Sequence, residues 1–503
     1  MAVLVTDYLG EMAERFPDKI AYSDVESSLT YKELRESASK IATALLKKGI
    51  THKPVLVCLD RSVGELAAFL GVALSGSFYT PIDMSMPVAR IDKIVNTLEP
   101  AAAITSDKHL ELMGQTSYDG PVLTLEDCGN CHPDYELVNR AVSSTVDTDP
   151  LYVLFTSGST GTPKGVVIAH RSIVDYAERV RETFDIDENA VFGNQAPFYF
   201  DHSGLDIYVT LCTGARMHII PKRLFSFPVK LLEHIVENQI NTLFWVPSAY
   251  CLVANLKALG KVDISCVTKV LSGGEVMPTK QLNKWRKALP NALFANLYGP
   301  TEIAVDCTYY IVDRDFDDSE PLPIGVPFRN TDILVLDEHD NLVTPDDVGV
   351  EGELCVRGSC ISMGYYNNPE KTSEVFVQNP LIKAYPDRIY RTGDLVRYNE
   401  RGEIMYVSRM DFQIQHAGRR VELGEIECAA QSLPEVTACC CQYDEKRMQI
   451  VLFYSGNIEE ADVSAGVSKL VPDYMVPGRL VHMDALPLNL NGKVDRQKLK
   501  SMI

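Results

Sequence analysis

The segment Leu151-Tyr-Val-Leu-Phe-Thr-Ser-Gly-Ser-Thr-Gly-Thr-Pro-Lys-Gly-Val-Val167 decides how the chain is interpreted. Its apolar start predicts a strand, which runs into a loop of Gly, Ser and Thr and then into a second apolar run. The loop glycines permit close backbone approach, and the hydroxyl groups are hydrogen-bond donors. Lys164 adds a mobile cation. This composition predicts a loop that holds a polyphosphate.

The loop differs from the common GxxxxGK[ST] phosphate loop, because Gly165 follows the lysine where that motif needs Ser or Thr. A flexible turn between two strands is the alternative reading of the same residues.

Around this segment, β-branched apolar runs alternate with stretches of helical period, which predicts α/β layers with mainly parallel strands. The expected strands are Pro54–Cys58, Ala102–Thr105, Leu151–Thr156, Met217–Ile220 and Leu243–Val246, and the expected helices are Tyr31–Lys48, Lys230–Asn238 and Thr279–Leu289. After about Thr308 shorter strands with turn signals predict a β-rich subdomain, in which the Asn399-Glu-Arg-Gly402 turn indicates a hairpin. The last part of the chain predicts a small α+β lobe.

Composition excludes several classes of function. The 503 residues contain 48 Lys plus Arg against 68 Asp plus Glu, a net charge of −20, which disfavours binding of nucleic acid through its phosphates. No run of apolar residues is long enough for a membrane span, and the start of the chain has no basic region typical of a signal peptide. We therefore expect a cytoplasmic protein with no membrane partner, and we expect its 13 cysteines to be reduced thiols.

The phosphate loop is one of several segments that stand in a familiar order. Together they resemble the adenylate-forming (ANL) superfamily of acyl-CoA synthetases, luciferases and the adenylation domains of nonribosomal peptide synthetases. The segments are LTYKEL (29–34), GSFYTPID (76–83), the phosphate loop, FDHS (200–203), YGPTE (298–302), GEL (352–354), YRTGD (390–394), RMD (409–411) and NGK (491–493). The resemblance implies a large N-terminal body of layered α/β subdomains plus a β-rich subdomain, residues 1–410, and a small mobile C-terminal lobe, residues 411–503.

The resemblance also implies two half-reactions. A carboxylate attacks the α-phosphate of ATP to give an acyl-adenylate and pyrophosphate, and a thiol then attacks the adenylate to give a thioester. Both steps need positive charge and fixed donors where negative charge builds up. Lys493 would contact the carboxylate and the phosphate, Thr301 would touch the α-phosphate, and Glu302 would hold Mg²⁺ on the phosphates.

Other residues are assigned by the same resemblance. The implied ATP- and AMP-binding residues are Thr156, Ser157, Gly158, Ser159, Thr160, Gly161, Lys164, Gly273, Gly274, Glu275, Tyr298, Asp394 and Arg409. Asp411 resembles the hinge about which the lobe swings, and Gly418 resembles the residue that reaches the thiol entrance. Ser408 and Gln415 stand where the family usually has Gly and Lys, so the contacts of the hinge and of the thiolation step remain open.

Asp201 resembles the residue that pairs with the α-ammonium group in the amino-acid-activating branch, because a buried ammonium needs such a partner. Its alternative role is to cap the following segment. The implied substrate pocket comprises Asp201, His202, Leu205, Trp245, Leu271, Gly273, Leu297, Val305 and Asp306. The Trp245 indole favours a small substrate, and the polar His202 and Asp306 disfavour a wholly apolar one. Serine, glycine or alanine is expected; D-alanine stays open, although D-alanine:carrier protein ligases commonly carry Cys where Gly273 stands.

The expected partners are ATP, Mg²⁺, a small amino acid and a separate carrier protein with a phosphopantetheine thiol, since no carrier segment follows Lys493. Because carrier proteins are usually acidic, we expect a local basic patch that includes Arg419 and Arg420. Two alternatives remain: an acyl- or aryl-CoA ligase, and a catalytically inactive binding subunit.

Overall fold

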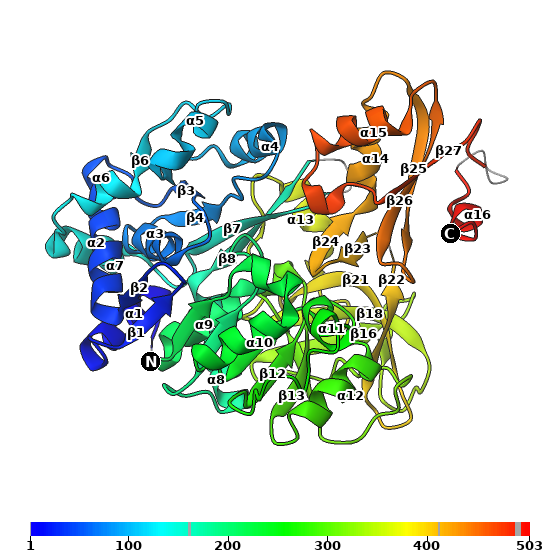
Figure 1. Ribbon diagram of the computed structural model, residues 1–503, viewed down its shortest axis with the longest axis horizontal. Coiled ribbons are helices and arrows are strands. Elements are labelled where there is room, and N and C mark those ends of the chain that lie inside the picture. The colour runs from blue at the N-terminus through cyan, green and yellow to red at the C-terminus, as the bar shows by residue number, and fades with distance from the viewer. Residues whose placement is uncertain (1, 159–161, 411–412, 488–493) are drawn as a thin grey trace.

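The computed structural model describes residues 2–158, 162–410, 413–487 and 494–503. Figure 1 shows the N-terminal body, blue to yellow, with the orange and red C-terminal lobe on one side of it. We call residues 2–410 the body and the described residues after 412 the C-terminal lobe.

A seven-stranded sheet carries the phosphate loop. Its strand order is β19 (Gly364–Tyr365), β8 (Lys164–Ala169), β7 (Pro150–Thr156), β4 (Phe78–Pro81), β3 (Pro54–Cys58), β5 (Ala102–Thr105) and β6 (Val122–Thr124). The strands from β6 to β7 are parallel, whereas β8 returns antiparallel to β7. The apolar residues of β3 are fully buried, as expected for a parallel strand covered on both faces.

A nine-stranded sheet lies beside it in the body. Its order is β15 (Val326–Pro327), β14 (Thr308–Ile311), β13 (Leu293–Tyr298), β12 (Lys269–Ser272), β11 (Thr242–Trp245), β9 (Val191–Asn194), β10 (Arg216–Ile219), β1 (Ile20–Ser23) and β2 (Ser28–Thr30). The six strands from β13 to β1 pair in parallel, and antiparallel strands are added at both edges. Their carboxyl ends therefore open toward one edge, the usual place for a ligand in an open α/β sheet.

The β-rich part of the body is a separate antiparallel sheet. Its strands are β17 (Leu342–Val343), β16 (Thr331–Leu336), β18 (Glu351–Gly358), β21 (Arg388–Tyr398) and β20 (Phe376–Gln378), with β22 (Ile404–Arg409) paired to β21. The turn between β21 and β22 is the Asn399–Gly402 segment that the sequence predicts as a hairpin.

Helices cover these sheets. Those of the body are α1 (Val5–Arg15), α2 (Tyr31–Lys47), α3 (Val63–Leu74), α4 (Val88–Leu98), α5 (Leu110–Met113), α6 (Leu125–Gly129), α7 (Tyr135–Ser144), α8 (His170–Phe184), α9 (Ser203–Thr213), α10 (Pro228–Glu237), α11 (Pro247–Asn255), α12 (Thr279–Ala288) and α13 (Pro369–Val375). The 3₁₀ turns are η1 (Asp107–His109), η2 (Lys222–Ser226), η3 (Thr301–Ile303) and, in the lobe, η4 (Asp473–Met475).

The C-terminal lobe has its own core. A two-stranded hairpin, β23 (Gln413–His416) and β24 (Arg419–Glu422), precedes helix α14 (Leu423–Gln431). A three-stranded sheet of β25 (Val436–Asp444), β26 (Gln449–Gly456) and β27 (Arg479–His482) follows, with α15 (Glu460–Ser468) and α16 (Arg496–Lys500). Apolar residues of α14, α15 and this sheet pack together, separately from the body.

The structure confirms the α/β fold class. The predicted strands at 54–58 and 102–105 match β3 and β5 in full, and the other predicted elements agree to within two residues at either end. All 13 cysteines are free thiols. Among the described residues, no helix is both long enough and apolar enough to span a bilayer.

Candidate active site

The phosphate loop leaves β7 at Thr156, next to the junction between body and lobe. The Thr156 Oγ1 atom is buried and has no hydrogen-bond partner among the described residues. A Cβ atom at Gly158 would lie 2.1 Å from the Thr162 carbonyl oxygen, so only glycine fits this turn. Ser159, Thr160 and Gly161 lie outside the described residues.

The hairpin β23–β24 of the lobe contacts this loop. The Ser157 hydroxyl donates to the Arg420 carbonyl oxygen at 3.0 Å and accepts from the Glu422 amide at 3.1 Å. The Lys164 Nζ atom lies 3.5 Å from Glu422 Oε1. Burial lowers the pKa of Lys164, and the nearby Arg420 lowers it further. Two groups of the phosphate loop are therefore bonded to the lobe.

Glu302 lies on the other side of the hairpin, in the 3₁₀ turn η3. Its side chain is 0 % exposed and accepts hydrogen bonds from the Tyr365 hydroxyl at 2.8 Å and from Arg420 Nη1 at 2.6 Å. Burial by itself would raise the pKa of Glu302, but the Arg420 and Lys164 cations outweigh it and lower the pKa to about 2. Glu302 is a carboxylate held ionised in a buried place.

Asp201 lies two residues before helix α9, which begins at Ser203, and its side chain contacts Thr301. Burial raises the pKa of Asp201 to about 6, while a hydrogen bond with the Thr301 side chain opposes that rise. The Glu302 charge raises the pKa further. The structure thus brings together Asp201, which the resemblance assigns to the substrate, and the Thr301–Glu302 segment, which it assigns to the phosphates and magnesium.

Apolar and polar side chains meet next to Asp201. The His202 ring stacks on Phe244, with ring centres 3.8 Å apart, and its Nε2 atom is buried without a partner among the described residues. Burial lowers the pKa of His202 to about 3, so the imidazole is neutral. The predicted residues Leu205, Leu271, Leu297 and Val305 are buried in the same apolar cluster as Phe244.

Asp306 lies at the far side of this pocket. The Tyr176 hydroxyl donates to Asp306 Oδ2 at 2.8 Å, and burial raises the pKa of Asp306 to about 8. A Cβ atom at Gly273 would lie 3.3 Å from Asp306 Oδ1, from the Leu297 carbonyl oxygen and from Phe244 Cε2. The space around Gly273 is therefore tight, and a side chain there would press against these three groups.

Trp245 is a correction to the sequence prediction. Its side chain is 0 % exposed and packs with Phe225, Tyr250 and Trp285, and its Nε1 donates to the Gly193 carbonyl at 2.8 Å. This second apolar cluster does not include His202 or the predicted pocket leucines. Successive side chains of a strand face opposite sides of the sheet, so Phe244, not Trp245, faces His202.

Tyr298 and Asp394, which the resemblance assigns to the nucleotide, form a second group of side chains in the candidate site. The Tyr298 hydroxyl donates to Asp394 Oδ2, and Arg409 Nη1 lies 3.0 Å from Asp394 Oδ1. Burial raises the pKa of Asp394, although Arg409 opposes that rise. The structure therefore brings together Tyr298, Asp394 and Arg409, three of the residues that the resemblance assigns to the nucleotide.

The Gly273–Glu275 segment reaches both the pocket and the lobe. Glu275 Oε2 accepts from the Ser248 amide at 2.8 Å, and Glu275 Oε1 accepts from the Gly418 amide at 2.5 Å. Ala417 and Gly418 both have positive φ, which forms the tight two-residue turn of the hairpin. A Cβ atom at Gly418 would lie 2.5 Å from Val246 Cγ1. The turn therefore fits against the body only as glycine.

The expected basic patch at Arg419 and Arg420 is also corrected. The Arg420 side chain is 11 % exposed and points inward to Glu302. The Arg419 guanidinium lies over the rings of Tyr474 and Phe200, at 4.3 and 5.3 Å from their centres. Both guanidinium groups make contacts between lobe and body, and hydrogen bonds or aromatic rings compensate the cost of their desolvation. They therefore do not form a basic patch on the surface.

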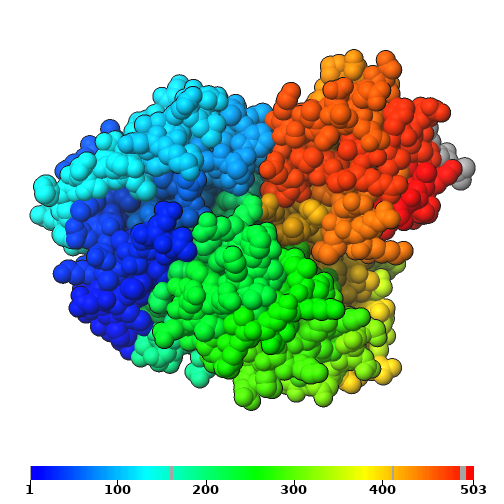
Figure 2. Space-filling view, viewed as in Figure 1, coloured from blue at the N-terminus to red at the C-terminus, as the bar shows by residue number. Residues whose placement is uncertain are grey.

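A further contact joins the lobe to the body. Arg90 of α4 forms a buried ion pair with Glu425 of α14. Figure 2 shows the lobe pressed against the blue surface that contains α4 and against the green part of the body. Lys493, the predicted catalytic lysine, and Asp411, the predicted hinge, lie outside the described residues.

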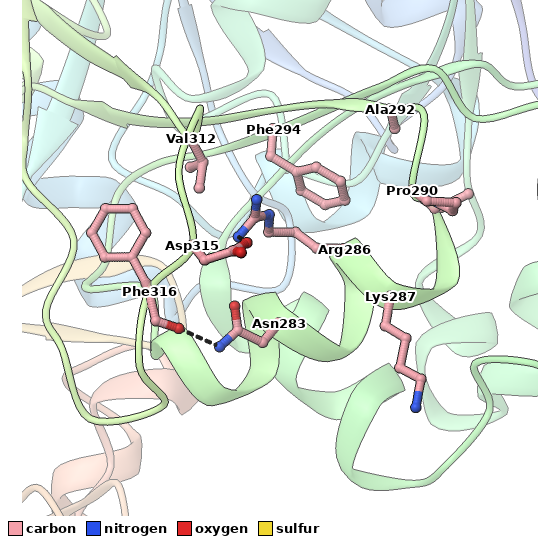
Figure 3. A pocket seen from close by; sticks show the side chains of 10 residues that line it. Asn283, Arg286, Lys287, Pro290, Ala292, Phe294, Val312, Asp315 and Phe316 are labelled. Atoms are coloured by element: carbon pink, nitrogen blue, oxygen red, sulfur yellow. Dashed lines mark hydrogen bonds and ion pairs between the residues drawn. The ribbon is translucent and has the colours of Figure 1, made fainter.

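Two further features bear on the search for a site. Within the described part of the chain, no three His, Cys, Asp or Glu side chains form a group that could hold a metal ion. A hollow of about 590 Å³ lies between α12 and the strands beside it, lined by Asn283, Arg286, Phe294 and Asp315 among others (Figure 3). None of the predicted site residues lines it, and Arg286 lies 3.4 Å from Asp315.

Some residues of the site were missed from the sequence. Phe244 could have been found, because alternation along the strand decides between it and Trp245. Tyr176 and Tyr365 lie far in sequence from the carboxyl groups that they contact, and no local pattern indicates those contacts.

The chain is similar to known proteins over nearly its whole length. A family model described as AMP-binding enzyme matches residues 9–366. Bacitracin synthase 1 of Bacillus licheniformis is 33% identical over 97% of the chain, which spans only 9% of that protein. Zwittermicin A synthase ZmaJ of Bacillus cereus is 30% identical over 99% of the chain and 95% of its own length.

The chain also resembles solved structures in its fold. A four-domain nonribosomal peptide synthetase bound to AMP and glycine superposes with a TM-score of 0.72 at 28% identity, over 98% of this chain and 36% of that one. An artificially fused adenylation–PCP di-domain protein from Klebsiella oxytoca has a TM-score of 0.81 at 22% identity, over 99% and 96% of the two chains, and shows a shared fold.

Proposed function

Because the chain belongs to the AMP-binding enzyme family, we propose that it activates a small amino acid with ATP and passes it to a carrier protein. In the first half-reaction the substrate carboxylate attacks the α-phosphorus of ATP, and pyrophosphate leaves. In the second a phosphopantetheine thiolate attacks the carbonyl carbon of the aminoacyl-adenylate, and AMP leaves. The product is an aminoacyl thioester.

One observation supports the proposal: the Asp201 carboxyl group shares a hydrogen bond with the side chain of Thr301, the residue directly before Glu302. The ionised form of Asp201 is disfavoured by burial and by the Glu302 charge, so a cation is needed to stabilise it. The α-ammonium group of an amino acid supplies that cation. Its carboxylate would then lie near Thr301, the residue assigned to the α-phosphate.

The remaining nucleotide groups have matching chemistry. The Asp394 carboxylate can accept two hydrogen bonds from the vicinal hydroxyls of a ribose, and Tyr298 offers an aromatic face for the adenine. Lys164, Ser157 and the orphaned Thr156 hydroxyl are donors for the phosphates. Lys493 would join them from the lobe after a rotation about Asp411, at the proposed boundary between residues 410 and 411.

The donor set also fits Mg²⁺. A hard carboxylate oxygen of Glu302 suits this ion, which usually takes one or two protein carboxylates together with substrate phosphates. When bound, the ion would neutralise negative charge on the phosphates during adenylate formation.

A small polar side chain fits the pocket. Phe244 and the crowded position at Gly273 limit its volume, while His202 Nε2 and the Asp306 carboxyl group lack a full set of partners among the described residues. A serine hydroxyl could hydrogen-bond to these groups, which favours serine over glycine and alanine.

The thiol acceptor is proposed to be a carrier protein. The related di-domain structure joins an adenylation domain to a PCP domain, which supports this class of partner. That the carrier is a separate protein stays a prediction.

The proposal is tested by ATP–pyrophosphate exchange with each L- and D-amino acid. We expect exchange above background with serine or another small amino acid, and Asp201→Asn should lower it by about a hundredfold because the ammonium loses its charged partner, about 3 kcal/mol. Asp187→Asn, at an exposed carboxylate, is the matched control. Exchange that requires a non-amino acid and tolerates Asp201→Asn would favour an acyl- or aryl-CoA ligase. No exchange with any acid would favour an inactive binding subunit.

A further inference from the structure

A second hollow, of about 340 Å³, lies in the body where the start of α8 meets the start of β21 and the segment between β18 and β19. We call it the α8 hollow. Ala169, at the opposite end of β8 from Lys164, forms part of its wall. None of the described residues that the resemblance assigns to substrate or nucleotide lines it. Its lining residues include Thr148, Arg171, Ile361, Ser362, Met363 and Arg388.

Two arginines of the α8 hollow have no anionic partner. Arg171 is exposed, and Arg388 Nη2 donates to the Met363 carbonyl oxygen at 3.2 Å. The Arg388 guanidinium also lies 4.6 Å from the centre of the Phe376 ring, and partial burial lowers its pKa. In the parts of the chain that the structure describes, neither arginine forms an ion pair with a carboxylate. A scarcity of acidic residues does not explain this, because 68 Asp plus Glu stand against 48 Lys plus Arg.

The start of α8 adds positive charge to the same place. Arg171 lies in the first turn of this 15-residue helix, where the helix dipole is positive and a second cation is unfavourable. The first turn contains no acidic residue, and no side chain caps it. The His170 and Arg171 amides donate to the carbonyl oxygens of Asp149 and Asp147, but neither of these acidic residues lines the hollow. An anion in the hollow would compensate both the cation and the dipole.

Ser362 provides an observation that is independent of these charges. Its side chain is 1 % exposed, and its Oγ atom is buried without a hydrogen-bond partner among the described residues. The backbone around it is fixed, because the Ser362 amide donates to the Glu302 carbonyl oxygen at 2.8 Å and the Met363 amide donates to the Val167 carbonyl oxygen at 2.9 Å. Buried hydroxyl groups in proteins nearly always have a partner. The Ser362 hydroxyl is therefore available to a ligand of the hollow.

We propose that the α8 hollow binds the phosphoryl group of a small phosphorylated molecule, at a site additional to the nucleotide site. Arg171 and Arg388 would pair with the phosphoryl oxygens, the Ser362 hydroxyl would donate to one of them, and the group would lie at the positive end of α8. Two guanidinium groups exceed what one carboxylate needs, whereas a phosphate monoester carries a charge of about −1.5 to −2 and three acceptor oxygens.

The size and the remaining wall of the hollow favour an ester over the free ion. A volume of about 340 Å³ falls within the range of small-molecule sites, about 300 to 1,000 Å³. Ala169, Ile361 and Met363 offer apolar contacts beside the cationic groups. The organic part of the ligand would lie against these three side chains.

The test measures the binding of phenyl phosphate by ligand-detected NMR. Arg171→Met and Arg388→Met should each weaken it by about tenfold or more, the usual effect of losing a hydrogen bond to a charged group. Ser362→Ala should also weaken it. This variant should unfold at the same temperature as wild type or higher, because it removes a buried hydroxyl that has no partner among the described residues in the free protein. Arg397→Met, at an exposed arginine further along β21, is the matched control and should bind as wild type does.

Two further ligands identify the chemistry. Benzoate should bind more weakly than phenyl phosphate, and benzoate that binds equally well would overturn the assignment to a phosphoryl group. Inorganic phosphate that binds as tightly as phenyl phosphate would keep the phosphoryl site but overturn the preference for an ester.

The location has its own contradicting outcomes. If phenyl phosphate binds at the phosphate loop instead, Lys164→Met loses the binding while Arg171→Met and Arg388→Met keep it, and the inference is overturned. Absence of binding by wild type at millimolar phenyl phosphate would overturn it as well.

Discussion

The Gly418 amide of the lobe donates to Glu275 Oε1 of the body across 2.5 Å, and this bond joins the hairpin turn to the segment that follows β12. Gly418 has a φ of 76°, and Val246 fills the space where a side chain would begin. The contact therefore depends on the absence of a Cβ atom.

Replacement Gly418→Ala should impair the second half-reaction more than the first. The left-handed backbone costs an alanine about 1–2 kcal/mol, and the clash with Val246 adds to this whenever the hairpin docks. We expect the rate of carrier loading to fall at least about tenfold relative to the rate of ATP–pyrophosphate exchange. A cost of about 1–2 kcal/mol on docking of the hairpin corresponds to a change of this size.

Gly402→Ala is the matched control, because Gly402 has a φ of 71° and its nearest neighbour to a new Cβ is Pro345 at 3.5 Å. It carries similar backbone strain without contact between lobe and body. Equal changes in both rates for Gly418→Ala, or an equal effect of Gly402→Ala on their ratio, would contradict the argument.

Phe244 and Trp245 should differ sharply on substitution. Phe244→Ala enlarges the pocket beside His202 and should admit larger amino acids in the exchange assay. Trp245→Ala leaves a cavity in the second core and should lower the free energy of unfolding by about 3–5 kcal/mol, with the order of amino acid preference unchanged. Urea unfolding and an amino acid panel measure the two effects. A change of amino acid preference in the Trp245 variant would indicate that Trp245 lines the pocket after all.

Asp306 should make the stability of the ligand-free protein fall as pH rises. Burial raises the pKa of Asp306 from its ordinary value to about 8, so the folded state holds a proton that the unfolded state has released. The stabilisation is complete below about pH 4, the ordinary pKa of Asp, and is lost as pH rises toward 8, at about 1.4 kcal/mol for each unit of pKa difference. Asp306→Asn, which can still accept from Tyr176, should flatten the unfolding free energy across this window. Denaturant titrations at several pH values test this; an unaltered slope would show that the carboxyl group is ionised throughout.

Asp394 should confer recognition of the ribose. Asp394→Asn removes a charged acceptor for the two hydroxyls and should weaken AMP binding by about 1.5–3 kcal/mol, roughly 10- to 150-fold. The analogue without the 2′ and 3′ hydroxyls should bind wild type and variant alike. Calorimetry with both ligands separates this role from a general effect: if the variant weakens both equally, Asp394 acts only through Tyr298 and Arg409.

The amino-acid sequence predicts the fold well because its signals are local. The β3 strand at 54–58 is a continuous apolar run, and the β21–β22 hairpin turns at a Gly-containing tetrapeptide, so neither needs knowledge of distant residues. Asp201, Thr301 and Glu302 are indicated as site residues by the resemblance of the FDHS and YGPTE segments to the ANL superfamily, which is again a local signal.

Other parts of the site depend on information that a linear pattern lacks. Trp245 and Phe244 are adjacent aromatic residues in a strand buried on both faces, so hydrophobicity does not reveal which of them faces the pocket. Arg420 looks like a surface cation in sequence, because its partner Glu302 is more than a hundred positions away on another part of the fold. Both features depend on contacts between segments that are distant in sequence, rather than on local propensity.

The buried Arg90–Glu425 pair limits how this protein can be recombined with its relatives. A chimaera whose incoming lobe lacks an acidic residue at the position of Glu425 leaves the buried Arg90 cation without a counter-ion. The same holds for Glu302 and Lys164, whose partners also reside in the lobe. Exchange of substrate specificity by swapping the whole body, which contains the pocket, therefore requires that the incoming body carry partners for these lobe residues, and a graft confined to the pocket around Phe244 avoids the problem.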